Sequence, residues 1–377
     1  MSERSEQSPA QKSWPVVGIF LIMFISGLAF SRDFVLPVLL ALLLALVFRP
    51  VRTGLNRVGI PHALAAFAIT GTLLVGLFSS AYVLSGPVER WIEDAPRIMA
   101  RVERKIDALR DSVDAVAEAA DRIDEMARRA ESGSSDSTPR LEVEAQESSS
   151  IVTKVLTTTP VIVGQLMFTL VLLYFLLASG DLFYRRVVQI TPNFRDKRRA
   201  MQIATDIERR LSRYLSTITL INALLGISVG VMAWLIGLPD PILFGLMAFG
   251  FNFIPYVGAI AGTVITFLIG FISFDQVSFA FLGAGLYFML TSIEGQLVTP
   301  LAVGRSLKLN PVVVFLSVAF WAWLWSVVGM IIAVPVLVVL RVFCEHIPAL
   351  ENLGQFLISA DQGAIRDAEA EEREFRV

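Results

Sequence analysis

Long apolar runs recur along this chain, and they limit what it can fold into. A helix of about 18 or more apolar residues is long enough to cross about 30 Å of hydrocarbon. Several such runs occur in the 377 residues, which are 55% hydrophobic and only 18% charged. A soluble domain of this length would not need repeated runs of that kind. The sequence therefore predicts an all-α protein, a polytopic transmembrane helix bundle in contact with a lipid bilayer.

Hydropathy and helix-breaking residues divide the chain into about eight spanning or partly re-entrant segments. The charged pair Arg32–Asp33 predicts a sharp turn between two spanning helices, with a re-entrant hairpin as the alternative. The stretch 242–272 is either one long kinked helix or two half-helices, because Pro255 interrupts it. The expected segments lie at about 14–30, 34–48, 62–85, 160–178, 215–238, 242–272, 277–293 and 311–343.

Polar stretches separate the membrane parts from the rest of the chain. Within the predicted insert, apolar residues from Val102 to Ile123 recur at spacings of 4 and 3. This heptad seam is typical of a coiled coil or of one arm of an intramolecular hairpin. The parts are a polar tail (1–13), membrane segments one to three (14–85), an extramembrane helical insert (86–155), membrane segments four to eight (156–345, with a basic cytoplasmic helix at 185–213) and an acidic, solvated tail (346–377).

Basic residues gather after the second and fourth segments. Arg49, Arg52 and Arg57 follow segment two, and the basic helix at 185–213 follows segment four. Short loops with an excess of Lys and Arg stay in the cytoplasm. The pattern predicts a multi-pass protein of the bacterial inner (plasma) membrane, with both termini cytoplasmic and the insert on the opposite side.

The sequence lacks the short motifs of common nucleotide-binding and catalytic sites. There is no GxxxxGK[ST] loop, no HExxH and no GxSxG, and Cys344 is the single cysteine. Basic residues form no stripe of the kind that tracks phosphates along nucleic acid. We therefore expect no enzyme activity, no cofactor, no metal site and no nucleic-acid partner.

Candidate pathway residues surround the break in the sixth segment. Pro255 must kink or break the helix, and freed carbonyls at membrane depth are tolerated only against protein or water. Broken helices of this kind form substrate sites in many secondary transporters. Asn252, Pro255, Tyr256 and Gly258 are thus candidates, although a purely structural kink explains them as well. For Asn222 in segment five, an interhelical hydrogen bond is favoured over a ligand role.

Two further candidates, Glu294 and Gln296, follow the seventh apolar run. A buried carboxylate in a membrane segment can carry a coupling proton. The alternative is a helix-end acid at the headgroups, which the position alone favours slightly. A polar loop then extends from Thr299 to Pro311, bracketed by Pro300 and by Asn310 with Pro311.

Several motifs in one register resemble the AI-2E family of transporters, also called autoinducer-2 exporters or PerM-like permeases. The resemblance covers nearly the whole chain and is strongest from Pro160 to Arg341. The chain departs at Gly295, where the family often has Asn, and at Ser326, where it usually has Gly. The motifs are Ile254-Pro255-Tyr256-Val257-Gly258, Tyr174-Phe175-Leu176-Leu177 with Asp181 and Arg185-Arg186, Ile293-Glu294 through Pro300, Gly304-Arg305, Leu309-Asn310-Pro311, Trp323-Leu324-Trp325, Gly329 and Ala333-Val334-Pro335.

The resemblance implies a multi-spanning transporter with an extramembrane helical insert, assembled as a homo-oligomer. Members are associated with export of the signal AI-2 and some with sodium/proton antiport. The leading hypothesis is secondary, ion-coupled export of a small polar solute or signal, with H⁺ or Na⁺ as the coupling ion. The alternatives are Na⁺(Li⁺)/H⁺ antiport and an oligomeric membrane scaffold without transport.

Overall fold

A computed structural model describes residues 14–87, 104, 149–180, 194–303, 309–347, 350, 354 and 357. These residues are helical almost throughout, which confirms the all-α prediction. Six helices in the described part are long and apolar enough to cross a membrane. The heptad seam from Val102 to Ile123 lies outside the described residues except for Arg104, as do residues 1–13 and most of the C-terminal tail.

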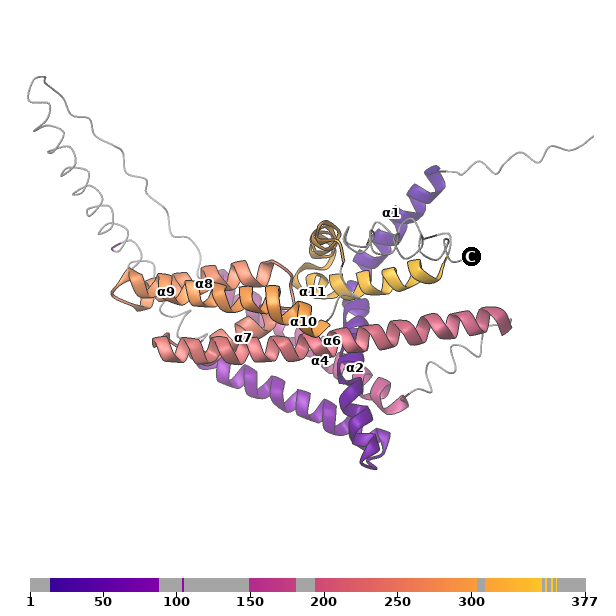
Figure 1. The fold of residues 1–377 in the computed structure, drawn as a ribbon, viewed down its shortest axis with the longest axis horizontal. Helices are drawn as coiled ribbons and strands as arrows, with labels where there is room; N and C mark the ends of the chain where they lie inside the picture. The colour runs from indigo at the N-terminus through magenta and orange to yellow at the C-terminus, as the bar shows by residue number, and fades with distance from the viewer. Residues whose placement is uncertain are drawn as a thin grey trace, which may run out of the picture.

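The helices differ in several bounds from the expected segments. From residue 194 onward, the basic helix and segment five are one continuous helix, α6, which runs along most of the molecule in Figure 1. In chain order the elements are α1 (Trp14–Phe30), α2 (Arg32–Arg57), the helix His62–Pro87, α4 (Ser149–Ser179), α6 (Phe194–Ile236), α7 (Pro241–Phe251), α8 (Val257–Ser273), α9 (Val277–Ile293), the π-helical turn η1 (Glu294–Val298), α10 (Thr299–Val303) and α11 (Pro311–His346).

The first two helices do not form the predicted pair joined by a sharp turn, nor a re-entrant hairpin. The chain passes from α1 into α2 with a bend and no reversal (Figure 1). At the junction, Ser31 N donates to Gly27 O at 2.9 Å and Val35 N donates to Ser31 O at 2.9 Å. Only Ser31, with ψ of 10°, leaves the helical region. Arg32 and Asp33 are accommodated because both side chains are exposed.

The long helix α6 is the centre of the fold. It contacts α2, α7, α9, α10 and α11, whereas α8 packs mainly on α9 and α4 on α2. Gly226 of α6 faces Gly245 of α7 so closely that a Cβ on either would come within 2.8 Å of the other's backbone. The two glycines therefore let α7 lie directly against α6.

A cluster of buried apolar side chains joins α2, the helix His62–Pro87 and α4. Its buried members include Ala41, Ala66 and Leu173. Arg52 of α2 is buried and donates from Nη1 to Leu177 O at 3.4 Å. A cation at the C-terminal end of α4 stabilises the helix dipole, so this buried arginine helps to fix α4 against α2.

Candidate functional site

The sixth segment consists of two half-helices, which confirms one of the two predicted alternatives. α7 ends at Phe251 and α8 starts at Val257. Between them Tyr256 has φ of 66° and ψ of −42°, and Val257 N donates to Pro255 O at 2.7 Å. This is a γ-turn with positive φ at its centre, a rare and strained conformation for a residue other than glycine. Strain of this kind concentrates at functional sites.

The two half-helices run antiparallel as a helical hairpin. A Cβ on Gly258, at the start of α8, would meet Phe251 O at 2.3 Å. At the open end, Leu238 lies near both Gly270 of α8 and Gly283 of α9. The hairpin α7–α8 therefore opens near the C-terminal end of α6, and its tip points back toward the N-terminal half.

Two asparagines connect the tip of this hairpin to α6. Asn252 Nδ2 donates to Asn222 Oδ1 at 2.8 Å. Asn222 is 0% exposed, and its own Nδ2 has no hydrogen-bond partner among the described residues. Asn222 thus makes the predicted interhelical bond and also leaves one buried donor unused. An unused donor at membrane depth costs free energy unless a ligand or water binds it.

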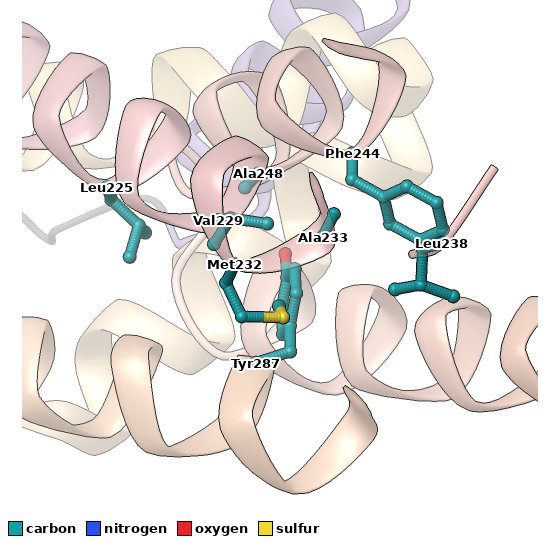
Figure 2. Close-up of a cluster of buried hydrophobic side chains, with 8 residues drawn as sticks. All are labelled: Leu225, Val229, Met232, Ala233, Leu238, Phe244, Ala248 and Tyr287. Atoms are coloured by element: carbon teal, nitrogen blue, oxygen red, sulfur yellow. The ribbon is translucent and has the colours of Figure 1, made fainter. Parts of the chain in front are cut away.

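A compact apolar cluster holds α9 against α6 and α7. In Figure 2 the ring of Tyr287 reaches from α9 toward Val229, Met232 and Ala233 of α6. The side chain of Tyr287 is 1% exposed. Its hydroxyl lies against Gly262 of α8, where a Cβ would be 1.9 Å away. This cluster fixes the relative depth of α6, α8 and α9.

Glu294 lies within a continuing helix and not at a helix end, which was the alternative that its position slightly favoured. The helix α9 continues through the π-helical turn η1 into α10, whose last residue is Val303. The polar loop therefore begins later than predicted. π-Helical turns are rare and are frequent at functional sites.

The carboxylate of Glu294 is half-buried in this turn. Thr299 Oγ1 donates to its Oε1, and the hydroxyl of Tyr214 on α6 is near enough to interact with its charge. Glu294 lies seven residues beyond Tyr287, and Asn222 lies seven residues before Val229. At 1.5 Å per residue, Glu294 lies about 10 Å along α9 from Tyr287, and Asn222 lies about 10 Å along α6 from Val229 in the same direction.

The side chain of Gln296 is exposed, so Gln296 does not join the half-buried group formed by Glu294 and Thr299. No cluster of three or more His, Cys, Asp or Glu side chains that could hold a metal ion occurs in the described part of the chain.

The segment predicted as one last spanning helix is broken, and the sequence analysis missed this. Within α11, Trp325 (φ −134°, ψ 20°) and Ser326 (φ 56°, ψ −141°) are not helical, and Figure 1 shows α11 changing direction along its length. A Cβ on Gly329 would meet Trp321 O at 2.0 Å, Ser317 Oγ donates to Ala333 O at 3.4 Å, and Val313 shares a buried cluster with Leu337.

These facing residues step apart by four on each side of the break, which is the register of an antiparallel pair. α11 is therefore a second helical hairpin, with arms 311–324 and 327–346. Asn310 caps the first arm by accepting from Val312 N at 3.0 Å, with Pro311 at the first helical position. Pro335 and Gly329 are buried in the second arm. The tip is held by Trp325 Nε1, which donates to Leu28 O at 3.2 Å.

Ion pairs fix the open end of this second hairpin to the basic half of α6. Arg210 pairs with Glu345 at 2.7 Å and His346 lies 3.3 Å from Asp206. Beyond α11, Leu357 is 3% exposed and shares a cluster with Cys344. The C-terminal tail was expected to be solvated. At Leu357 this expectation is wrong, because the apolar side chain packs into the cluster that contains Cys344 of α11.

The two hairpins open toward opposite ends of α6 and touch between them. Ile254 at the tip of α7–α8 packs against Val318 and Ala333, one from each arm of α11. Ile254 immediately precedes Pro255 and lies two residues after Asn252. The structure thus places Asn222, Asn252, Pro255 and Tyr256 at a junction of two broken helices.

Comparison with known proteins agrees with this architecture. The family model described as AI-2E family transporter matches residues 19–349. "Putative transport protein YrrI" of Bacillus subtilis is 34% identical over 176 residues, which are 46% of this chain and 49% of YrrI, so that match spans about half of the relative. "Putative transport protein YhhT" of Escherichia coli is 24% identical over 86% of this chain and 88% of its own length. "AI-2 transport protein TqsA" of Escherichia coli is 22% identical over 89% and 93%.

The family match covers most of the chain, including both hairpins and the helices around them. Two of the motifs that suggested the resemblance, Ile254-Pro255-Tyr256-Val257-Gly258 and Trp323-Leu324-Trp325, lie where helices break. This multi-pass membrane protein belongs to the AI-2E family of transporters.

Proposed function

We propose that this protein is a secondary transporter, which moves a small polar solute through the junction of the hairpins α7–α8 and α11. The observation that carries the proposal is the contact of Ile254 with Val318 and Ala333, since it joins two broken helices that open toward opposite ends of α6. Discontinuous helices that meet near the membrane midplane are the substrate sites of many secondary transporters.

The polar groups at this junction suit a solute that forms hydrogen bonds. Asn222 offers an unused buried donor, and Asn252 is held beside it. Between Arg213 and Arg305 the sequence has no basic residue, so an anionic solute would find no opposite charge from this stretch. The name of the relative TqsA mentions AI-2, and we propose a small polar signal of this kind as the first solute to test.

Glu294 is our proposed site of ion coupling. Its carboxylate lies in a π-helical turn, half-buried and hydrogen-bonded by Thr299, near Tyr214 of α6. Ionisable residues inside the membrane commonly mark proton or ion pathways. The other acids of the region, Asp240 and Asp275, lie in the turns at the ends of α7 and α8, where water is accessible.

Na⁺(Li⁺)/H⁺ antiport is the second candidate, because a carboxylate beside a hydroxyl can bind H⁺ or Na⁺ in turn. Antiport requires Glu294 but does not require Asn222 or Asn252. Substitution of the asparagines therefore distinguishes solute transport from antiport.

Proteoliposomes with an imposed pH gradient test the proposal. We expect uptake of AI-2 in the wild type, loss of uptake in Glu294→Gln and in Asn222→Leu, and normal uptake in the charge-matched control Asp275→Asn. Sodium flux without AI-2 that survives Asn222→Leu would favour the antiporter. No solute or cation flux in the wild type, with folding shown by thermal unfolding, would contradict both and favour the membrane scaffold.

The side of the membrane is part of the proposal. If the basic half of α6 lies in the cytoplasm of a bacterial inner membrane, α11 opens to the cytoplasm and the C-terminus is cytoplasmic. The prediction of a cytoplasmic N-terminus assumed a chain reversal at Arg32–Asp33, which the bend at Ser31 does not provide, so its side stays a prediction. Homo-oligomer formation also stays a prediction.

A further inference from the structure

One face of α6 carries most of the exposed side chains between Arg209 and Trp234. Exposed side chains recur every three or four residues apart from the step from Arg213 to Leu220, so they lie on a single stripe. The stripe begins with two arginines and continues with apolar residues. It consists of Arg209, Arg213, Leu220, Leu224, Ile227, Val231 and Trp234.

The stripe has the length of a bilayer. Trp234 lies 21 residues after Arg213, which is about 31 Å along the helix and matches the hydrocarbon thickness of about 30 Å. Tryptophan and arginine both favour the boundary between hydrocarbon and water. Arg209 and Arg213 therefore lie at the level of the lipid headgroups at one boundary.

These two arginines differ from their neighbours in having no ion pair to another described residue. Arg210, between them, pairs with Glu345, and Arg49 pairs with Glu208 at 3.0 Å. Arg209 and Arg213 are one helical turn apart, with about 5–6 Å between their Cβ atoms. Both guanidinium groups can thus reach the same phosphate, the anion that arginine binds best through paired hydrogen bonds.

Apolar surface continues from this pair toward the membrane centre. Leu220 and Leu224 are 62% and 55% exposed. Beyond them, a groove of about 760 Å³ between α6 and α7 is lined by apolar residues such as Ala223, Ile227 and Phe249. A ligand that complements the two arginines and the apolar residues next to them has a phosphate at one end and a hydrocarbon chain that extends toward the membrane centre. We propose that Arg209 and Arg213, with the adjoining apolar side chains of Leu220 and Leu224, bind an anionic phospholipid.

Lipid binding to the purified full-length protein tests this inference, for example by native mass spectrometry with phosphatidylglycerol and phosphatidylcholine of the same chains. We expect tighter binding of phosphatidylglycerol. Each arginine at an anionic surface contributes roughly five-fold, so Arg209→Gln with Arg213→Gln should weaken phosphatidylglycerol binding about 25-fold. Binding of phosphatidylcholine, whose phosphate is neutralised by its own choline, should weaken much less. The matched control Arg57→Gln, an exposed arginine at the end of α2, should have no such effect.

Two outcomes would overturn the inference: equal binding of both lipids to the wild type, or an unchanged preference in the double variant. Competition by inorganic phosphate alone, without dependence on the acyl chains, would show a free phosphate site instead. An unchanged thermal unfolding midpoint confirms that the double variant folds. The measurement does not involve solute flux, so it stands or falls separately from the transport proposal.

Discussion

The hairpins α7–α8 and α11 have the same architecture, but they are built from different residues. Each has one non-glycine residue with positive φ at its tip, Tyr256 in the first and Ser326 in the second. Each has a glycine early in its second arm, Gly258 and Gly329, that faces a carbonyl of the first arm. Only the first contains a proline and a pair of hydrogen-bonded polar side chains at its tip, Asn252 with Asn222, whereas the tip of α11 makes a bond from Trp325 Nε1 to a backbone carbonyl. The polar tip is suited to bind a solute, whereas the apolar tip of α11 supports it.

The largest expected difference between the hairpins is the side from which their open ends can be reached. In a Cys344→Ser background, we predict that a membrane-impermeant maleimide labels Gln276→Cys, at the open end of α7–α8, from one side only. It should label Val312→Cys, at the open end of α11, from the other side only. Both positions are exposed in the structure. Labelling of both from the same side would break the opposition of the two hairpins.

The glycines give the next largest effect. A Cβ at Gly329 or Gly258 would overlap a backbone carbonyl, at 2.0 Å and 2.3 Å, so helix arms must separate to admit it. We predict that Gly329→Ala and Gly258→Ala each lower the free energy of unfolding by about 3 kcal/mol, measured by thermal or denaturant unfolding in detergent. Gly285→Ala is the control, since nothing lies within 4 Å of its added Cβ. Equal stability of all three variants would mean that the hairpins do not close as described.

The polar contact of the first hairpin should matter more than that of the second. Asn222→Ala removes the acceptor of Asn252 and leaves its amide unpaired, which costs about 1–3 kcal/mol. Ser317→Ala removes a bond of 3.4 Å between the arms of α11, and we expect a loss of at most about 0.5 kcal/mol from so long a contact. A double-mutant cycle of Asn222 and Asn252 measures the coupling directly. No coupling between them would contradict a functional asparagine pair.

The sequence predicted the fold class and the interruption near Pro255 because their signals are local, and it left open whether that segment is one kinked helix or two half-helices. A proline within an apolar run breaks a helix wherever the run lies, and a lone asparagine such as Asn222 needs a partner in the membrane. The partner itself, Asn252, is 30 residues away on another helix, and only packing decides that the two meet.

The break in α11 and the true place of Glu294 were not predictable from local pattern. Trp325 and Ser326 are ordinary residues in an apolar run, and tertiary contacts such as Trp325 with Leu28 hold them out of the helix. The helix through Glu294 continues because a π-helical turn carries the chain past Gly295. One signal was available at Ser326, the position where the AI-2E family usually has Gly.

The backbone of Ser326 explains that family preference and leads to the smallest predicted effect. With φ of 56° and ψ of −141°, Ser326 adopts a region that is essentially restricted to glycine and costs about 1–3 kcal/mol for other residues. Ser326→Gly removes this strain but loses about 0.5–1 kcal/mol through the greater freedom of the unfolded chain. We therefore predict a net stabilisation of about 1 kcal/mol, seen as a higher unfolding midpoint. Ser326→Ala keeps the strained backbone and should not stabilise the protein. Equal unfolding midpoints for the two variants would show that the backbone at the tip of α11 is relaxed. The tips of the two hairpins would then differ in strain.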